Sequence, residues 1–173
     1  MNAKALHKMS YGLYIVSSIL DGKLNGQTAD AAMQVTSEPK RITVALNKKN
    51  LTHSFVKESG FFSLSVLSKE CPFKFIGRFG FRSGRDVNKC EGVNHRIGET
   101  GAPIVLDNCV AYADVDVIGS LDVGTHTLFV GEVKDCNILG DEEPMTYDYY
   151  HKIKGGKLPD TAATYIKEES SQS

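Results

Sequence analysis

Hydrophobic and polar residues alternate with a period of two along several stretches of the chain, as in β-strands that bury one face. Within residues 61–67, Phe62 and Leu64 alternate with Ser63 and Ser65. The same alternation occurs in residues 13–20, 41–46, 110–118 and 125–133. This pattern predicts short, separated strands with one buried face in an antiparallel barrel or sandwich, so the expected fold class is mainly β.

Helices are expected to be few and short. Residues 50–60 begin with Asn50, a residue type preferred at helix N-caps, and end with Gly60. Pro72 suits the first turn of a second short helix that ends before Gly77.

The remaining segments are expected to be turns, one more helix and a tail. The sequence DGKLNG at residues 21–26 predicts a turn, and residues 145–156 predict a short helix that ends at Gly155. Residues 166–173 are polar and predict a frayed tail. Because no repeat or linker interrupts the chain, we expect one domain over residues 1–173.

Composition narrows the class of protein. The chain has 173 residues, enough to bury a proper core, with 20 basic and 21 acidic residues and a net charge of −1. The chain therefore lacks the overall positive charge that would favour nucleic acid as a partner. Arg78, Arg82 and Arg85 form the only tight arginine cluster, which suits a local anion. A small molecule or another protein is the expected partner.

The cysteines and histidines do not predict a metal site. None of Cys71, Cys90, Cys109 and Cys136 forms a C-x-x-C pair, and the five histidines lack metal-ligand spacing. The first residues contain no apolar signal region, and no run is long enough to span a membrane. We therefore expect a cytoplasmic protein with free thiols, no membrane partner and no bound metal.

The segment NGQTADAAMQVTSEP at residues 25–39 mixes core-like and hydrogen-bonding residues. Ala29, Ala31 and Ala32 give it an apolar body, while Gln27, Thr28 and other short polar residues fill the rest. No phosphate loop, metal cluster or nucleophile elbow is present in it.

Three further segments are candidates for chemistry. In residues 46–53 a strand ends and a helix begins, and free N–H groups at a helix start suit an anion; ordinary capping by Asn50 is the alternative. Residues 77–86 carry three glycines and three arginines, which suit either a flat anionic ligand or a surface loop. His126 stands at the entry of a strand, where a structural role is also possible. Because no group is catalytic by itself, chemistry is expected from a bound cofactor.

Seven segments, taken in order, resemble one family. They are SYGLYIVSS, NGQTADAAMQVTSEP, ALNKKNLTHSFVKESG, FIGRFGFRSGRD, TGAPIVL, DVGTHTLFVGEV and KGGKLPDTAATY. The chain is similar over residues 8 to 165 to flavin reductase-like proteins, in particular to archaeal ferric reductases and flavoredoxin-like flavoproteins. The resemblance implies an FMN-binding split β-barrel of the Greek-key type.

The resemblance also implies a homodimer that binds FMN in a groove at its interface. The edge at residues 27–37 would contact the flavin ring and ribityl chain, residues 47–52 would receive the phosphate, and residues 78–85 would flank the cofactor. His126 would lie beside the flavin as the catalytic candidate. The implied cofactor-binding residues are Gln27, Thr28, Ala29, Gln34, Val35, Thr36, Asn47, Lys48, Asn50, Leu51, Thr52, Arg78, Phe79, Gly80, Arg85 and His126.

The implied reaction is hydride transfer from NAD(P)H to the flavin, followed by electron release to a ferric chelate, a free flavin or a small redox protein. An electron carrier of the flavoredoxin kind, reduced by a protein partner, is the alternative, and a ligand-binding barrel without catalysis is a third. Ala45 stands where close ferric reductase relatives have cysteine, which weakens a ferric specialisation. Arg82, Lys154 and Lys157 are candidates for contact with a 2′-phosphate.

Overall fold

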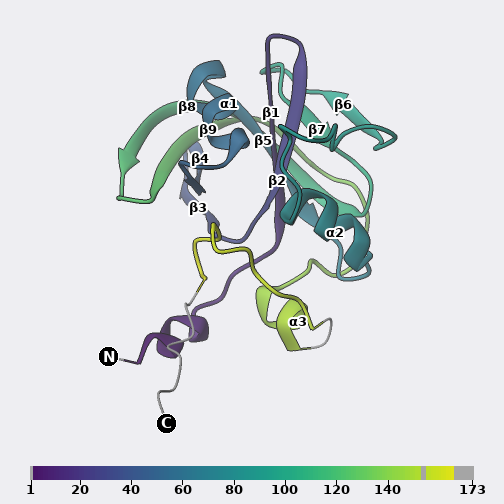
Figure 1. The fold of residues 1–173 in the computed structure, drawn as a ribbon. Helices are drawn as coiled ribbons and strands as arrows, with labels where there is room; N and C mark the ends of the chain where they lie inside the picture. Colours follow the sequence, from purple (N-terminus) through teal and green to yellow (C-terminus); the bar gives the residue numbers. More distant parts are fainter. Residues whose placement is uncertain (1, 153–154, 166–173) are drawn as a thin grey trace.

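The computed structural model describes residues 2–152 and 155–165. Its centre is a seven-stranded antiparallel sheet with the order β2-β1-β5-β8-β9-β4-β3, beside a two-stranded hairpin, β6-β7 (Figure 1). The strands are β1 (Tyr14–Leu20), β2 (Lys23–Ala29), β3 (Ala32–Ser37), β4 (Lys40–Asn47), β5 (Phe61–Leu67), β6 (His95–Ile97), β7 (Pro103–Val105), β8 (Cys109–Asp122) and β9 (His126–Ile138). The helices are η1 (Ala3–Lys8, 3₁₀), α1 (Leu51–Ser59), α2 (Phe73–Gly80) and α3 (Tyr147–Lys152).

The sheet closes into a barrel that remains split along one side. Strands β2 and β3 are the two outer strands of the sheet, yet only Asp30 and Ala31 connect them. Two residues span only a few ångströms, so the sheet must curl until its opposite edges meet at this corner. The N–H of Ala45 on β4 donates to the carbonyl of Ala31 at 2.9 Å. The expected mainly β split barrel with short helices is confirmed.

The central strands are buried on both faces, which corrects the expectation of one buried face per strand. Ser63 and Ser65 alternate with the apolar residues of β5 but are as fully buried as Phe62. One hydrophobic cluster fills the barrel, and a second lies between the outer face and α2 with β7. Because these added elements cover the outer face, Ser63 Oγ donates to the carbonyl of Pro103 at 2.6 Å instead of to water.

Several element boundaries also differ from the sequence predictions. Strands β8 and β9 have 14 and 13 residues and are not short, because each pairs with neighbours along its whole length. The turn expected at residues 21–26 contains only Asp21 and Gly22, both with positive φ, and β2 follows at once.

The helix ends agree with expectation for α1 and differ from it for α2. Helix α2 continues through Gly77 to Gly80. Helix α1 ends at Gly60 in the left-handed conformation, as expected. Helix α3 ends at Lys152, and the expected continuation to Gly155 passes through residues outside the described part, as does the tail at 166–173.

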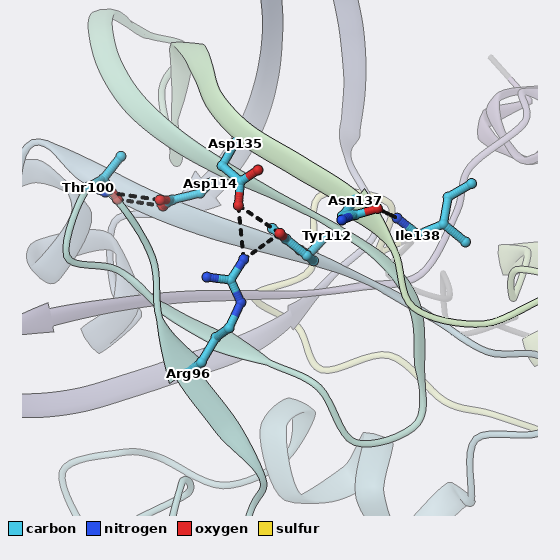
Figure 2. A network of polar contacts seen from close by, with 7 residues as sticks. All are labelled: Arg96, Thr100, Tyr112, Asp114, Asp135, Asn137 and Ile138. Carbon is cyan, nitrogen blue, oxygen red and sulfur yellow. Dashed lines mark hydrogen bonds and ion pairs between the residues drawn. The ribbon is translucent and has the colours of Figure 1, made fainter.

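A polar network fixes the β6-β7 hairpin against the long strands (Figure 2). Arg96 of β6 donates to Asp135 of β9 at 2.9 Å and to the hydroxyl of Tyr112 on β8, which in turn donates to Asp135 at 2.6 Å. Fully buried Asp114 accepts from the N–H and the hydroxyl of Thr100 in the hairpin loop. These bonds satisfy the buried carboxylate and hold the hairpin over the outer face of β5.

The four cysteines are free thiols, as expected, with Cys136 exposed and the other three buried. In the described part of the chain, no helix is long and apolar enough to cross a membrane.

Phe62 provides a test of the barrel core, because its side chain is 0% exposed. We expect Phe62→Ala to lower the free energy of unfolding by about 3 to 5 kcal/mol, through lost burial and the cavity left behind. Urea unfolding measures the change. Ile138→Ala is the matched control: this side chain is also apolar and on a strand, but is 74% exposed, so its substitution should change stability by at most about 0.5 kcal/mol. Equal losses in the two variants would contradict this assignment of the core.

Candidate functional site

A cavity of about 330 Å³ lies at the split of the barrel. Its walls come from β2, from the junction of β4 with α1, and from the end of α2 with the loop that follows. A volume of this size is within the range of small-molecule and cofactor sites. The cavity exists because β2 and β3 meet only at their shared corner, which leaves the adjacent edge unpaired.

Most of the residues that the family resemblance implied surround this cavity. They come from four segments, and the outermost residues, Gln27 and His126, are 99 positions apart in the sequence. Eleven of the sixteen line it, namely Gln27, Thr28, Ala29, Asn47, Asn50, Leu51, Thr52, Phe79, Gly80, Arg85 and His126. The fold therefore places these separate segments around one space.

The other five residues lie elsewhere in this chain. Gln34, Val35 and Thr36 are exposed on β3, which runs along the outer edge away from the corner. The side chain of Lys48 forms an ion pair with Asp122 at 2.6 Å, and Arg78 donates to the carbonyl of Glu91. Within one chain these side chains do not meet the others at the cavity.

One end of the cavity has the properties of an anion site. Asn50 occupies the N-cap position of α1, but its side chain makes no capping hydrogen bond. Buried Thr52 accepts a hydrogen bond from Asn25 Nδ2 at 2.8 Å, which leaves its own hydroxyl proton available to a ligand. Arg85 donates to the carbonyl of Lys49 at 3.3 Å and so lies against the same helix start. Helix N–H groups, a hydroxyl and a guanidinium together suit a phosphate.

Gly84 shows how closely the loop after α2 approaches this end. A Cβ atom at this position would lie 2.0 Å from Asn25 Oδ1 and 3.1 Å from Leu51 Cδ2. Only glycine therefore allows the arginine-bearing loop to pack against β2 and α1. This requirement gives a structural reason for one of the glycines in the segment GRFGFRSGRD.

Lys89 is a buried cation in the cavity wall that the sequence did not reveal. Its side chain is 5% exposed, and Nζ donates to the carbonyls of Gly26 at 2.8 Å and Phe79 at 3.1 Å. None of the ion pairs among the described residues includes it. Burial lowers the pKa of Lys89 to about 8, because the charged form loses its hydration. An ammonium has three N–H donors, so one remains for a ligand in the cavity.

The charge and polarity of the lining suit a flat anionic molecule. Asp30 is the single acidic side chain among the described lining residues, which include the cations Lys49, Arg82, Arg85, Lys89 and Lys157. Gln27 Oε1 is buried without a hydrogen-bond partner, so it can accept from an N–H of a ligand. Leu13, Ile76 and Phe79 supply apolar walls. A planar ring with a polar edge and a phosphate-bearing chain fits this combination of donors, acceptor and apolar surface.

His126 also lines the cavity, at the start of β9, where it pairs with Asn47 of β4. Its Nδ1 is 2.8 Å from the hydroxyl of Thr125, and its Nε2 is 3.2 Å from the carbonyl oxygen of Thr161. A carbonyl only accepts, so Nε2 must carry a proton in this arrangement. The imidazole is thus a hydrogen-bond donor at the cavity.

Comparison with known proteins places the chain in a class. Residues 6–154 match the flavin reductase like domain, and the chain belongs to this family. It is 49% identical over 169 residues to a ferric-chelate reductase (NAD(P)H) from Archaeoglobus fulgidus, which covers 98% of this chain and 100% of the relative.

Two further similarities extend the comparison. The chain is 44% identical to a high molecular weight rubredoxin from Moorella thermoacetica, over 95% of this chain and 72% of that protein. Its fold is similar to that of an FMN-binding protein from Thermus thermophilus, with a TM-score of 0.71 and 22% identity over 82% of this chain and 83% of the other.

The lowered pKa of Lys89 predicts a pH-dependent contribution to stability. Because the folded state holds this proton less tightly than the unfolded chain, ionised Lys89 is unfavourable below about pH 8, and its contribution to stability improves as pH rises toward 10.5. We expect the unfolding free energy of the ligand-free wild type to rise relative to that of Lys89→Met by roughly 2 to 3 kcal/mol between pH 7 and pH 10.

Urea unfolding at several pH values measures this difference. Lys89→Arg is the control, because a guanidinium stays charged throughout the range and should remove the same pH dependence. Parallel pH profiles for wild type and Lys89→Met would contradict a buried, destabilised ammonium.

Proposed function

We propose that this protein is an FMN-dependent NAD(P)H oxidoreductase that acts as a homodimer and passes electrons to a ferric chelate, a free flavin or a small redox protein. The observation that carries the proposal is the cavity at the barrel split. It combines an anion site at the start of α1, an unpartnered buried acceptor on Gln27 and a buried cation at Lys89. Full-length similarity to a ferric-chelate reductase supports the same chemistry.

FMN, when bound, would supply a ring that accepts a hydride and passes electrons on, while the protein supplies binding, orientation and electrostatics. In this proposal Asn50, Thr52 and Arg85 hold the phosphate at the start of α1. Gln27 accepts from the ring edge, and Lys89 offers its remaining N–H to an anionic part of the cofactor. The cationic lining favours FMN over riboflavin, because riboflavin lacks the phosphate charge.

His126 is proposed to orient the hydride donor beside the flavin. Its protonated Nε2 faces an acceptor in the structure, so it can donate to a polar group of a nicotinamide in the same place. Arg82 and Lys157 also line the cavity and are candidates for a 2′-phosphate, whereas Lys154 lies outside the described residues.

A second copy of the chain is proposed to cover exposed apolar surface on β3 and at the end of β8. Met33 is 66% exposed and Leu121 is 60% exposed, although both are large apolar residues on strands. Where such residues form a contiguous patch, the patch marks a contact with another protein. In that arrangement Gln34, Val35 and Thr36 would approach the cofactor held by the other copy.

An electron carrier without nicotinamide oxidation is the second candidate. The 44% identity to a protein named a high molecular weight rubredoxin is the observation that favours it. Both candidates need the same flavin site. Reduction by a protein donor, with NADH and NADPH inert, would favour the carrier.

The visible spectrum of the purified protein, followed by anaerobic addition of NADH or NADPH, tests the proposal. A yellow protein that one nucleotide bleaches supports the reductase. A yellow protein that neither nucleotide bleaches overturns it in favour of the carrier. A colourless protein that FMN does not reconstitute contradicts both and leaves a barrel that binds another ligand.

The anion site is tested by comparing affinities for FMN and riboflavin. We expect Asn50→Ala and Thr52→Val each to weaken FMN binding by about 10- to 150-fold, since a hydrogen bond to a charged group contributes about 1.5 to 3 kcal/mol. Riboflavin affinity should change little, because it has no phosphate. Thr52→Ser retains the hydroxyl and is the control. Equal losses for the two flavins would assign these residues to structure alone; fluorescence titration supplies both dissociation constants.

The role of His126 is tested by separating flavin reduction from flavin retention. We expect His126→Ala to slow reduction by NAD(P)H by at least about tenfold, because it removes a donor that positions the substrate. FMN affinity should fall by much less. Anaerobic stopped-flow absorbance and equilibrium titration measure the two quantities. If both remain at wild-type values, His126 is structural.

A further inference from the structure

The segment after α3, residues 156–165, runs along the cavity without forming a strand or a helix. It is the yellow trace in Figure 1 that leaves α3 and runs toward β3. Its start is held by α3, because Gly156 N donates to the carbonyl of Tyr150 and the Tyr150 hydroxyl donates to that of Lys157, both at 3.0 Å. Six residues of this segment line the cavity, namely Lys157, Leu158, Pro159, Thr161, Ala162 and Ala163. We refer to residues 156–165 as the strap.

The far end of the strap is held by Asp30, at the corner where β2 and β3 meet. The Thr164 hydroxyl donates to Asp30 Oδ2 across 134 positions of sequence. Asp30 is 4% exposed and lines the cavity. Burial raises the pKa of its carboxyl above the usual value, while the hydrogen bond from Thr164 and the nearby His126 oppose that rise. A carboxylate in this position is tolerated because it has a donor on the strap.

Between these two ends, the strap forms a hydrogen bond with the imidazole of His126. Nε2 of His126 donates to the carbonyl of Thr161 at 3.2 Å. The same N–H cannot serve a substrate while this bond is intact. The strap and any ligand that uses His126 therefore compete for one donor.

The strap also lines a second hollow. It has a volume of about 480 Å³ and is lined by residues that include Lys48, Asp160 and Tyr165. Thr161, Ala162, Ala163 and His126 line both this hollow and the first cavity. The strap is thus part of the wall that the two spaces share, together with Asn47, Lys49 and His126, and its movement would join them next to His126.

We propose that Asp30 is a positioning residue that, through Thr164, holds the strap across the cavity and on His126, so that the strap must leave His126 before a nicotinamide or an electron acceptor reaches the flavin. The inference rests on the proposed flavin site for its functional consequence. The hydrogen bond between Asp30 and Thr164 is present in the chain without any ligand. When closed, the strap excludes water from the cavity, and when displaced, it opens the second hollow to a substrate.

Hydrogen exchange of the ligand-free protein tests whether Thr164 holds the strap on Asp30. Exchange is measured by mass spectrometry on peptides from residues 155–165. We expect Thr164→Val to increase exchange in this segment by at least about threefold and to leave the peptides of β5 and β8 unchanged. Thr164→Ser should restore protection, because it restores the hydroxyl. Thr161→Val is the matched control: it makes the same substitution in the same segment but leaves the backbone carbonyl on His126, so protection should stay at the wild-type level. Unchanged exchange in Thr164→Val would overturn the inference.

The functional consequence is tested on the FMN-loaded protein by stopped-flow mixing with NAD(P)H. We expect Thr164→Val to release FMN faster and to lower the concentration of nucleotide needed for half-maximal reduction rate, since less free energy is spent on displacing the strap. Thr164→Ser should again resemble the wild type. A higher half-saturating concentration in Thr164→Val would overturn the gating role, because the strap would then be part of the nucleotide site. If neither nucleotide reduces the flavin, the proposed function fails while the exchange experiment still decides whether Asp30 holds the strap.

Discussion

The two-residue connection between β2 and β3 is the constraint on which the rest of the structure depends. Asp30 and Ala31 join the opposite edges of a seven-stranded sheet, so the sheet must curl, and the edges can meet only at that corner. The unpaired edge beside the corner becomes the wall of the cavity. The same corner carries Asp30, which holds the strap, and precedes exposed β3. Barrel shape, cavity position and strap attachment all follow from one short connection.

The wall of the cavity contains buried polar groups that lower the stability of the folded chain when no ligand is bound. Lys89 is a buried ammonium that donates to two carbonyls among the described residues, and Gln27 Oε1 is a buried acceptor without a donor there. Each such group costs folding free energy, yet each is suited to an anionic ligand with N–H groups. Buried polar groups with unused hydrogen-bonding capacity are typical of a binding site. They lower the stability of the folded chain, but they are available to bind a ligand.

The outer face of the barrel explains why the central strands lack a solvent side. The β6-β7 hairpin and α2 cover β1 and β5, and the network of Arg96, Tyr112 and Asp135 holds the hairpin in place. Because α2 is fixed on this covered face, its end and the following loop reach the cavity at a defined position. Packing far from the cavity therefore positions Phe79, Gly84 and Lys89 within it.

The sequence by itself determined the strands β1, β4, β5, β8 and β9, because side chains on a strand alternate between its two faces, and this alternation is a local property of the chain. It also determined the candidate segments around Gln27, Asn50, Arg85 and His126, through turn and helix-start signals and a family resemblance that needs no coordinates. Only the tertiary structure decided that Ser63 and Ser65 are buried, since the elements that cover them lie far away in sequence. It alone placed Lys89, whose surroundings come from β2 and α2, and the contact between Asp30 and Thr164, which 134 positions separate. Such contacts depend on how the sheet curls, and no local pattern of residues encodes that closure.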